Sequence, residues 1–355
     1  MSRPVRIAAA VLGVAAGTLL HRQDRRDRAA AADDPNGAEL TLDGLDLPTD
    51  HPLVVSADGT RLAVTVYGDP GAPTVVLAHG WTCTGRYWTP QIRALAGVAR
   101  VVVYDQRGHG ESALPAGGSL GPDQLAEDLA AVLATTVPAG ERAVLVGHSM
   151  GAMGIVAWAG KAPEDVARRA HAALLVNTGV GDLVSESLLL RLPSGWHRTR
   201  ALSGRLLMSS AAPTGRLSPI TRRAVRYATL SRSATPAQVE FCARIILGCP
   251  RRTRAGWGAA LTRLDLQQAL SRLDVPTSVI AGTEDRLTPP VLARKLAAGL
   301  PKPERFVTLE GVGHMSTVEA APMVTAEIRR LLEDYALLAG GGSPLQRREG
   351  VPSHP

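Results

Sequence analysis

Short apolar runs, rich in Val, Ile, Leu and Ala, recur along the chain and are separated by polar or glycine-containing segments. Each run is four to six residues long, the length of a strand rather than of a helix. Most are apolar throughout, which is typical of strands buried on both faces of a parallel sheet. The segments that predict strands are 74–78, 100–104, 143–146, 172–177, 277–282 and 305–310.

Stretches with helical spacing of apolar residues lie between or after these strands. Three of them are clear: 86–95, 122–137 and 319–338. In the second, Leu125, Leu129 and Val132 fall on one stripe of a helix, which would face a core. The alternation of strands and helices, without an internal repeat, predicts an α/β fold with a mostly parallel sheet covered on both faces.

Residues 147–151 read Gly-His-Ser-Met-Gly and stand directly between the predicted strand 143–146 and the helix-favouring stretch 152–158. This order forces Ser149 into a sharp turn whose neighbours must be nearly free of side chains. Its hydroxyl is thereby exposed at the end of a strand. A serine in an ordinary glycine-rich loop would require neither flanking element, so Ser149 is the candidate nucleophile.

A serine nucleophile needs a base, and the base needs a carboxylate that orients it. Both residue types follow in the expected order. Asp285 comes after the strand 277–282 and just before a proline-marked helix start. His314 lies in a glycine-containing loop beyond the strand 305–310.

Together these motifs resemble the α/β-hydrolase-fold family, in which serine, acid and histidine follow one another in this order. The resemblance covers residues from about 50 to about 338. It rests on 147–151, Asp285, His314, His79-Gly80-Trp81 after one strand, and 105–112 after the next. It implies an eight-stranded, mostly parallel sheet with a helical cap between strands 6 and 7.

The resemblance also implies a role for each site residue. Ser149 would attack a carbonyl carbon, His314 would take its proton, and Asp285 would stabilise the imidazolium. The backbone N–H groups of Met150 and Trp81 would bind the oxyanion. Gly80 would let the backbone turn inward, so that Gly80, Trp81 and Met150 would also contact the substrate.

Two other carboxylates compete for the role of the acid. Glu284 adjoins Asp285, but successive side chains in an extended segment point in opposite directions, so only one of them can face His314. The resemblance favours Asp285. Asp182 is the alternative, because some family members place the acid after the strand 172–177.

Three further histidines and one ion pair stand near these motifs. For His79, His109 and His148 we expect hydrogen bonding and support of turns rather than chemistry. Asp105 and Arg107 are expected to tie their loop together through a local ion pair.

Residues 182–272 interrupt the strand–helix alternation and are helical by composition, with five prolines. In relatives such an insertion lies over the catalytic face. The expected division is 1–49 for an N-terminal apolar segment and linker, 50–181 and 273–338 for the core, 182–272 for the cap, and 339–355 for a disordered tail. The apolar residues expected to line a pocket or the core of the cap are Trp196, Leu206, Leu207, Met208, Phe241, Ile245, Ile246 and Trp257.

Charge adds little to the functional assignment. The chain of 355 residues has a formal net charge of +7, and residues 182–272 hold fifteen Arg against four acidic residues. This asymmetry could steer anionic substrates, but Arg outnumbers Lys 36 to 3 throughout, so a solvated surface is the more economical interpretation.

Nucleic acid is not favoured, because no nucleic-acid motif is present. The three cysteines have no metal-ligand spacing, and neither a metal nor a cofactor is implied.

The N-terminus carries an apolar run, residues 7–20, with arginines on both sides. Fourteen residues are short for a membrane span, which needs about twenty. A weak membrane anchor, an atypical signal peptide and a soluble helix remain open. The basic residues after the run slightly favour membrane association with a cytoplasmic catalytic domain; the other option for localisation is a cytoplasmic protein.

The residue type of the candidate nucleophile narrows the set of possible reactions. A serine argues against the dehalogenase and epoxide-hydrolase branches of the family, which use an aspartate at this position. We expect hydrolysis of a carboxylic ester, or of a lipid or lactone ester, through an acyl-enzyme. The alternatives are a cofactor-free haloperoxidase or perhydrolase, a C–C bond hydrolase, and a receptor-like member that binds a ligand with little turnover.

Overall fold

One large sheet organises the molecule. The computed structural model describes residues 3–114, 119–189, 197–212 and 215–337. Within these ranges, eight strands form the sheet in the spatial order β1 (Thr49–Asp50), β4 (Val64–Tyr67), β6 (Arg100–Tyr104), β5 (Thr74–Ala78), β7 (Ala143–His148), β8 (Ala170–Val176), β9 (Thr277–Gly282) and β10 (Pro303–Leu309). The pairs β1–β4 and β4–β6 are antiparallel, and the others are parallel. A short hairpin, β2 (Val54–Val55) and β3 (Arg61–Leu62), stands apart.

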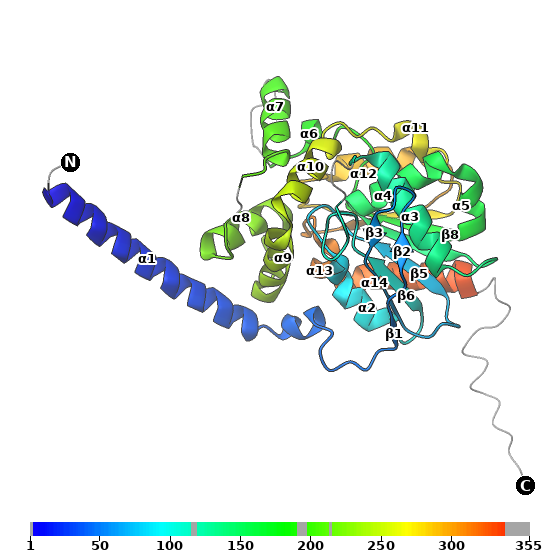
Figure 1. The fold of residues 1–355 in the computed structure, drawn as a ribbon, viewed down its shortest axis with the longest axis horizontal. Helices are drawn as coiled ribbons and strands as arrows, with labels where there is room; N and C mark the ends of the chain where they lie inside the picture. Colours follow the sequence, from blue (N-terminus) through cyan, green and yellow to red (C-terminus); the bar gives the residue numbers. More distant parts are fainter. Residues whose placement is uncertain (1–2, 115–118, 190–196, 213–214, 338–355) are drawn as a thin grey trace, which may run out of the picture.

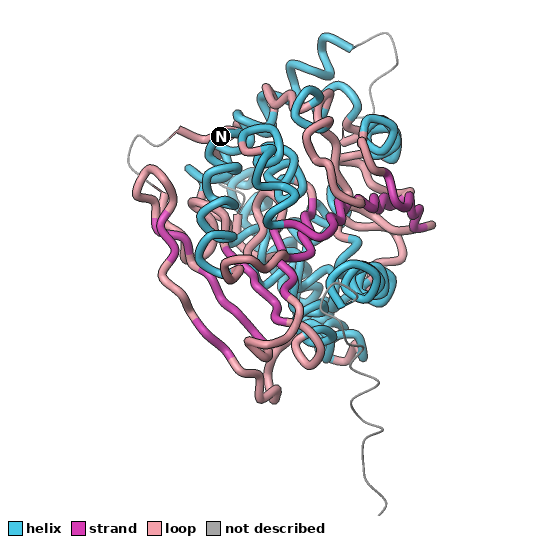
Figure 2. Tube along the Cα trace, turned by 90° about the vertical axis from the view of Figure 1, so that its right-hand side faces the viewer, coloured by secondary structure: helices cyan, strands magenta, loops and turns pink. Residues whose placement is uncertain are grey.

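The predicted fold class is confirmed: the sheet is mostly parallel and has helices on both sides (Figure 2). Adjacent strand residues face opposite layers, since Val76 packs in one apolar cluster and Val75 in the other. One layer contains α3 (Pro122–Thr136), α4 (Met150–Lys161), α5 (Pro163–Arg169) and α12 (Pro290–Gly299). The other contains η2 (Gly85–Trp88), α2 (Thr89–Leu95), α13 (Ser316–Glu319), α14 (Ala321–Leu331) and η3 (Leu332–Leu337).

The central strands and their helices form where the apolar pattern predicts them. All six residues of β7 are buried, as expected for a strand covered on both faces. In α3, the predicted stripe of Leu125, Leu129 and Val132 is buried, and Pro122 opens the helix, where its missing N–H costs nothing. These elements fix the carboxyl end of β7, where Ser149 follows.

Helices fill the chain between β8 and β9. The described residues there form α6 (Leu183–Glu186), α7 (His197–Met208), α8 (Pro219–Thr229), α9 (Pro236–Gly248), α10 (Arg251–Leu261) and α11 (Gln267–Leu270), without a strand. We call residues 182–272 the helical insertion. Among the residues expected to line a pocket, Trp257 is buried in the core and Leu206 is exposed. Trp196 lies outside the described residues, as does the predicted tail 339–355.

The N-terminal segment forms one helix, α1 (Arg3–Ala32), which runs past α8 and α9 and projects from the body (Figure 1). Asp24 on α1 pairs with Arg222 on α8 at 2.6 Å, and Arg222 also reaches Glu240 on α9 at 2.5 Å. Part of the expected linker is also ordered, as the short helix η1 (Pro35–Leu40). Before η1, Asp34 accepts a hydrogen bond from the backbone N–H of Ala237 at 2.9 Å. Within the described ranges, no helix is both long enough and apolar enough to cross a bilayer.

Candidate active site

Ser149 stands in a sharp turn between β7 and α4. Its backbone has φ +52° and ψ −117°, a conformation that costs a non-glycine residue about 1–3 kcal/mol. The flanking glycines are required by close approach. A Cβ on Gly147 would lie 2.4 Å from the backbone of Ala152, and one on Gly151 would lie 2.1 Å from the carbonyl oxygen of Ala78. The turn therefore requires glycine two residues before and two residues after the serine.

Asp285 and His314 meet at the same edge of the sheet. The imidazole Nδ1 of His314 lies 2.7 Å from Oδ2 of Asp285, and both side chains are buried. The other oxygen, Oδ1, accepts the backbone N–H groups of Leu287 at 2.8 Å and Thr288 at 2.9 Å. The carboxylate is thus fixed by its own loop and presents one oxygen to the imidazole.

The two competing carboxylates point elsewhere. Oε2 of Glu284 accepts the backbone N–H of Arg232 in the helical insertion at 3.0 Å. Thr283 and Glu284 form a turn after β9 rather than an extended segment, and the side chain of Glu284 leaves this turn away from His314. The side chain of Asp182 is half exposed and lies 3.6 Å from Nζ of Lys295. The structure therefore brings Asp285 to His314, and neither Glu284 nor Asp182.

His148 connects the serine turn to the histidine loop. Its Nε2–H donates to the carbonyl oxygen of His314 at 2.8 Å, and the two rings lie 4.8 Å apart. Among the described residues, the hydroxyl of Ser149 has no hydrogen-bond partner. Gly80 adjoins the same turn, because a Cβ on it would lie 2.7 Å from Nδ1 of His148 and 3.1 Å from Cβ of Ser149. The loop after β5 therefore packs directly against the candidate nucleophile.

Two backbone amides next to Ser149 are available as donors. Met150 is the first residue of α4, where helix geometry leaves the N–H without an intrahelical acceptor. Trp81 lies in the loop after β5, and its indole Nε1–H donates to the carbonyl of Arg254 at 3.1 Å. Neither backbone N–H has a partner within the described part of the chain. Met150 follows Ser149 directly, and Trp81 follows Gly80, the residue that packs against Ser149.

His79 and His109 support the loop after β5. His79 accepts the backbone N–H of Gln106 at Nε2, 3.0 Å away, and His109 accepts that of Thr82 at 3.2 Å. Burial lowers the pKa of His79 to about 4 and, with the neighbouring His79, that of His109 to about 3. Both rings are therefore neutral acceptors at pH 7.

These depressed values predict a loss of stability on acidification. The unfolded chain protonates its histidines near pH 6.5, whereas the folded chain resists until about pH 4 or below, so the unfolded state binds more protons in between. Stability present above pH 6.5 is lost as the pH falls through this window, by about 2 kcal/mol per buried histidine between pH 7 and pH 5. We expect His109→Gln to reduce this pH 7-to-5 loss, measured by urea denaturation, by about that amount. An equal loss of stability in the variant and the wild type would show that the buried His109 does not cause part of this loss.

The prediction of an ion pair between Asp105 and Arg107 is wrong. Arg107 is buried and reaches across to α3, where Nε and Nη2 bind the carboxylate of Asp128 at 2.7 and 2.6 Å. A third nitrogen, Nη1, binds Asp58 at 2.7 Å. Asp105 instead accepts backbone N–H groups of its own and the preceding loop. Arg107 therefore pairs with carboxylates that are distant in sequence, and the one that it binds through two nitrogens, Asp128, is buried.

Two residues that the sequence did not single out contact Asp285. Asn177, directly after β8, donates its side-chain N–H to Oδ2 of Asp285 at 2.9 Å. The hydroxyl of Thr288 donates to the same oxygen at 2.9 Å. The carboxyl ends of neighbouring parallel strands meet at one edge of the sheet, so a polar residue ending β8 could have been suspected from its position alone.

The helical insertion holds the histidine loop in place. The carbonyl oxygen of Thr229, the last residue of α8, accepts the backbone N–H groups of both His314 at 2.9 Å and Met315 at 3.2 Å. Two residues further, the N–H of Ser231 donates to Glu319 at 2.7 Å. The end of α8 is therefore in direct contact with the backbone of His314.

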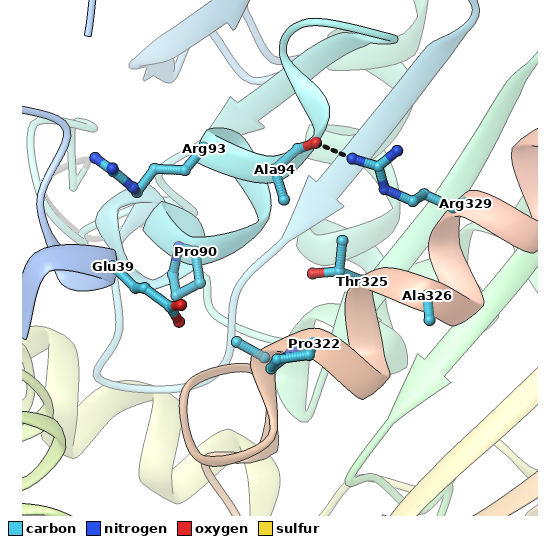
Figure 3. Close-up of a pocket in the computed structure, with 9 residues that line it drawn as sticks. Glu39, Pro90, Arg93, Ala94, Pro322, Thr325, Ala326 and Arg329 are labelled. Atoms are coloured by element: carbon cyan, nitrogen blue, oxygen red, sulfur yellow. Dashed lines mark hydrogen bonds between the residues drawn. The ribbon is translucent and has the colours of Figure 1, made fainter. Parts of the chain in front are cut away.

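A separate cavity of about 420 Å³ lies away from these residues (Figure 3). It is bounded by η1, α2 and α14, and none of Ser149, Asp285 and His314 lines it. Its lining residues are Glu39, Pro90, Arg93, Ala94, Ala321, Pro322, Thr325, Ala326 and Arg329. Among the described residues, no group of three or more His, Cys, Asp or Glu side chains is arranged to hold a metal ion.

The mostly parallel eight-stranded sheet with helices on both sides fits a hydrolase fold. The model of the alpha/beta hydrolase family matches residues 75–328. The chain belongs to this family.

Relatives and solved structures agree with that membership. RutD of Escherichia coli O81 (strain ED1a), provisionally named a carbamate hydrolase, is 31% identical over 293 residues, which cover 79% of this chain and 95% of RutD. The enol-lactonase of Burkholderia xenovorans LB400 superposes with a TM-score of 0.63 at 26% identity, covering 80% of this chain and all of the enzyme. The esterase RhEst1 of Rhodococcus sp. ECU1013 gives 0.63 at 25% identity, covering 80% and 99%.

Proposed function

We propose that the protein is a serine hydrolase that cleaves a carboxylic ester, including lipid and lactone esters, through an acyl-enzyme. Ser149 would be the nucleophile, His314 the general base and acid, and Asp285 the carboxylate that orients His314. The observation that carries the proposal is the hydrogen bond of 2.7 Å between Nδ1 of His314 and Oδ2 of Asp285. It lies at the edge of the sheet where Ser149 follows β7.

In the first step His314 would take the hydroxyl proton of Ser149 at Nε2 while the serine oxygen attacks the carbonyl carbon. Asp285 accepts the hydrogen bond from Nδ1–H, which favours the tautomer with a free lone pair on Nε2. The proton would then pass from His314 to the leaving alcohol. A water molecule, activated by the same imidazole, would release the acid and restore the serine.

The tetrahedral oxyanion would lie between the N–H groups of Met150 and Trp81. Their lack of other partners in the described residues supports this role. Each such donor is typically worth about 2.7–4 kcal/mol of transition-state stabilisation. The N-terminus of α4 adds a favourable dipole at the same point.

A carbamate is the second candidate substrate, because the chain is 31% identical to RutD, which carries that provisional name. The same nucleophile and oxyanion donors would act on a carbamate carbonyl. The two substrates differ in the acid that is released, a carboxylic acid or a carbamic acid, so they are separated by direct assay.

A panel of p-nitrophenyl esters of increasing acyl length, an aliphatic lactone and a p-nitrophenyl carbamate would decide between these candidates. We expect steady turnover of at least one ester, and Ser149→Ala should abolish it. Turnover of the carbamate without turnover of any ester would identify a carbamate, and not an ester, as the substrate. Ligand-dependent thermal stabilisation without turnover of any substrate would favour a receptor-like protein and contradict the proposed function.

A further inference from the structure

Asn177 ends β8 in a backbone conformation suited to few residues. It is fully buried and has φ +48°, a left-handed conformation that Asn and Asp adopt more readily than other non-glycine residues. Its backbone N–H donates to the carbonyl of Ile280 on β9 at 2.9 Å. This hydrogen bond holds Asn177 next to β9, the strand that leads to Asp285.

The side chain of Asn177 joins three parts of the site. Its Nδ2 donates to Oδ2 of Asp285 at 2.9 Å and to the carbonyl of Gly313, just before His314, at 3.2 Å. Its Oδ1 accepts the hydroxyl of Ser316, two residues after His314. An amide nitrogen facing two acceptors and an amide oxygen facing a donor leave only one sensible orientation. One amide therefore fixes the acid and both sides of the histidine loop.

The oxygen of Asp285 that Asn177 contacts is also the one that binds His314. Oδ2 receives Nδ1 of His314 at 2.7 Å, Nδ2 of Asn177 at 2.9 Å and the hydroxyl of Thr288 at 2.9 Å. Hydrogen bonds to a carboxylate favour its charged form and restrict its rotation. The amide thus acts on the very atom that orients the base.

We propose that Asn177 is a positioning residue that keeps the carboxylate of Asp285 aligned with His314, a role that rests on the proposed function. The amide matters because the left-handed site would accept an aspartate equally well. A carboxylate there would lie against Oδ2 of Asp285, and two buried carboxylates at that distance share one proton. The choice of an amide keeps the negative charge on the residue that faces the imidazole.

Within the described ranges, few other titratable groups lie near this site. His314 is bonded to Asp285, and His148 lies against His314. Glu284 and Arg286, which flank Asp285 in sequence, bind backbone atoms of the helical insertion at Arg232 and Tyr227. Glu319 binds the N–H of Ser231. None of them donates to Oδ2 of Asp285 except His314.

The test is the pH profile of kcat/KM for Asn177→Asp on the best ester of the panel. We expect kcat to fall about 10- to 100-fold at pH 7, the effect of losing one hydrogen bond to a charged group, while KM stays unchanged because Asn177 is fully buried. The acidic limb should move to higher pH by about one unit or more. A residue that only supported the fold would lower the melting temperature without moving this limb.

Asp182→Asn is the matched control. Asp182 also has a left-handed backbone, with φ +58°, but its side chain is half exposed and pairs with Lys295. The reverse exchange, of a carboxylate for an amide, should leave kcat, KM and the acidic limb unchanged there. A shift of the acidic limb in this control that is as large as in Asn177→Asp but in the opposite direction would show a general charge effect and overturn the proposal.

Ser316→Ala gives an independent answer if Asn177→Asp does not fold. It removes the donor to Oδ1 of Asn177, so that only the two hydrogen bonds of Nδ2 hold the amide, and kcat should fall about 3- to 10-fold with KM unchanged. Unchanged kcat in this variant, or an unmoved acidic limb in Asn177→Asp, would overturn only the role of Asn177 and leave the proposed function in place. Activity that survives Ser149→Ala would instead overturn the proposed function and this role with it.

Discussion

Replacing Ser149 with alanine should lower kcat about 10⁴- to 10⁶-fold while the protein stays folded. The expectation follows from a mechanism in which no other atom can form the acyl-enzyme. Removal of the hydroxyl costs the fold nothing in hydrogen bonds, since it has no partner among the described residues. Single-turnover and steady-state hydrolysis of a p-nitrophenyl ester would measure the loss, and the melting curve would confirm the fold.

Ser271→Ala is the control for this substitution. Its hydroxyl donates to the carbonyl of Gln268 on the exposed surface at 3.0 Å, away from Ser149. We expect wild-type kinetics from it. If Ser149→Ala kept more than a tenth of wild-type activity, the nucleophile would have been assigned to the wrong residue.

Replacing Asp128 with alanine should lower the free energy of unfolding by about 3–5 kcal/mol, the typical result of removing one partner from a buried ion pair. The side chain of Arg107 is fully buried and that of Asp128 is 3% exposed, so the guanidinium would lose its bidentate partner without gaining water. Asp58, at 2.7 Å, would compensate only in part, because its side chain is 38% exposed. Urea denaturation would give the change.

The exposed pair of Arg168 and Asp165 provides the comparison. Its two side chains lie 2.6 Å apart but are 66% and 35% exposed. Asp165→Ala should therefore change stability by no more than about 0.5 kcal/mol. Similar losses in both variants would mean that burial does not set the contribution of the Arg107 pair.

The fold and the candidate site could be predicted where the signal is local. Strand 143–146, the Gly-x-Ser-x-Gly turn and the helix after it follow one another without a gap, so the turn around Ser149 could be recognised from a few residues. Asp285 and His314 each follow a strand of the same parallel sheet. Because the carboxyl ends of such strands meet at one edge, their meeting could also be expected.

Partners that are distant in sequence could not be predicted. Arg107 pairs with Asp128, 21 residues away on a helix, although Asp105 is two residues away. The choice depends on how α3 packs over the loop, which no local pattern encodes. The place of Asn177 at the carboxyl end of β8 could have been suspected from the sequence, but its hydrogen bond to Asp285 depends on the packing of β8 beside β9.

The N-terminal segment shows a third limit of what the sequence could predict. The apolar run at residues 7–20 left an anchor, a signal peptide and a soluble helix open, because all three share the same composition. The helix α1 extends twelve residues beyond that run, to Ala32, and is tied to the helical insertion through Asp24 and Arg222. That ion pair joins residues 198 positions apart in the sequence, so the apolar pattern could not reveal it.

The central claim is that Ser149 is the activated nucleophile of a serine hydrolase. The most direct measurement is labelling of the full chain with a fluorophosphonate, followed by peptide mass mapping. We predict one labelled peptide, carrying the probe on Ser149, and no labelling of Ser149→Ala. Labelling at another residue, or an unlabelled protein that still hydrolyses esters, would contradict the claim.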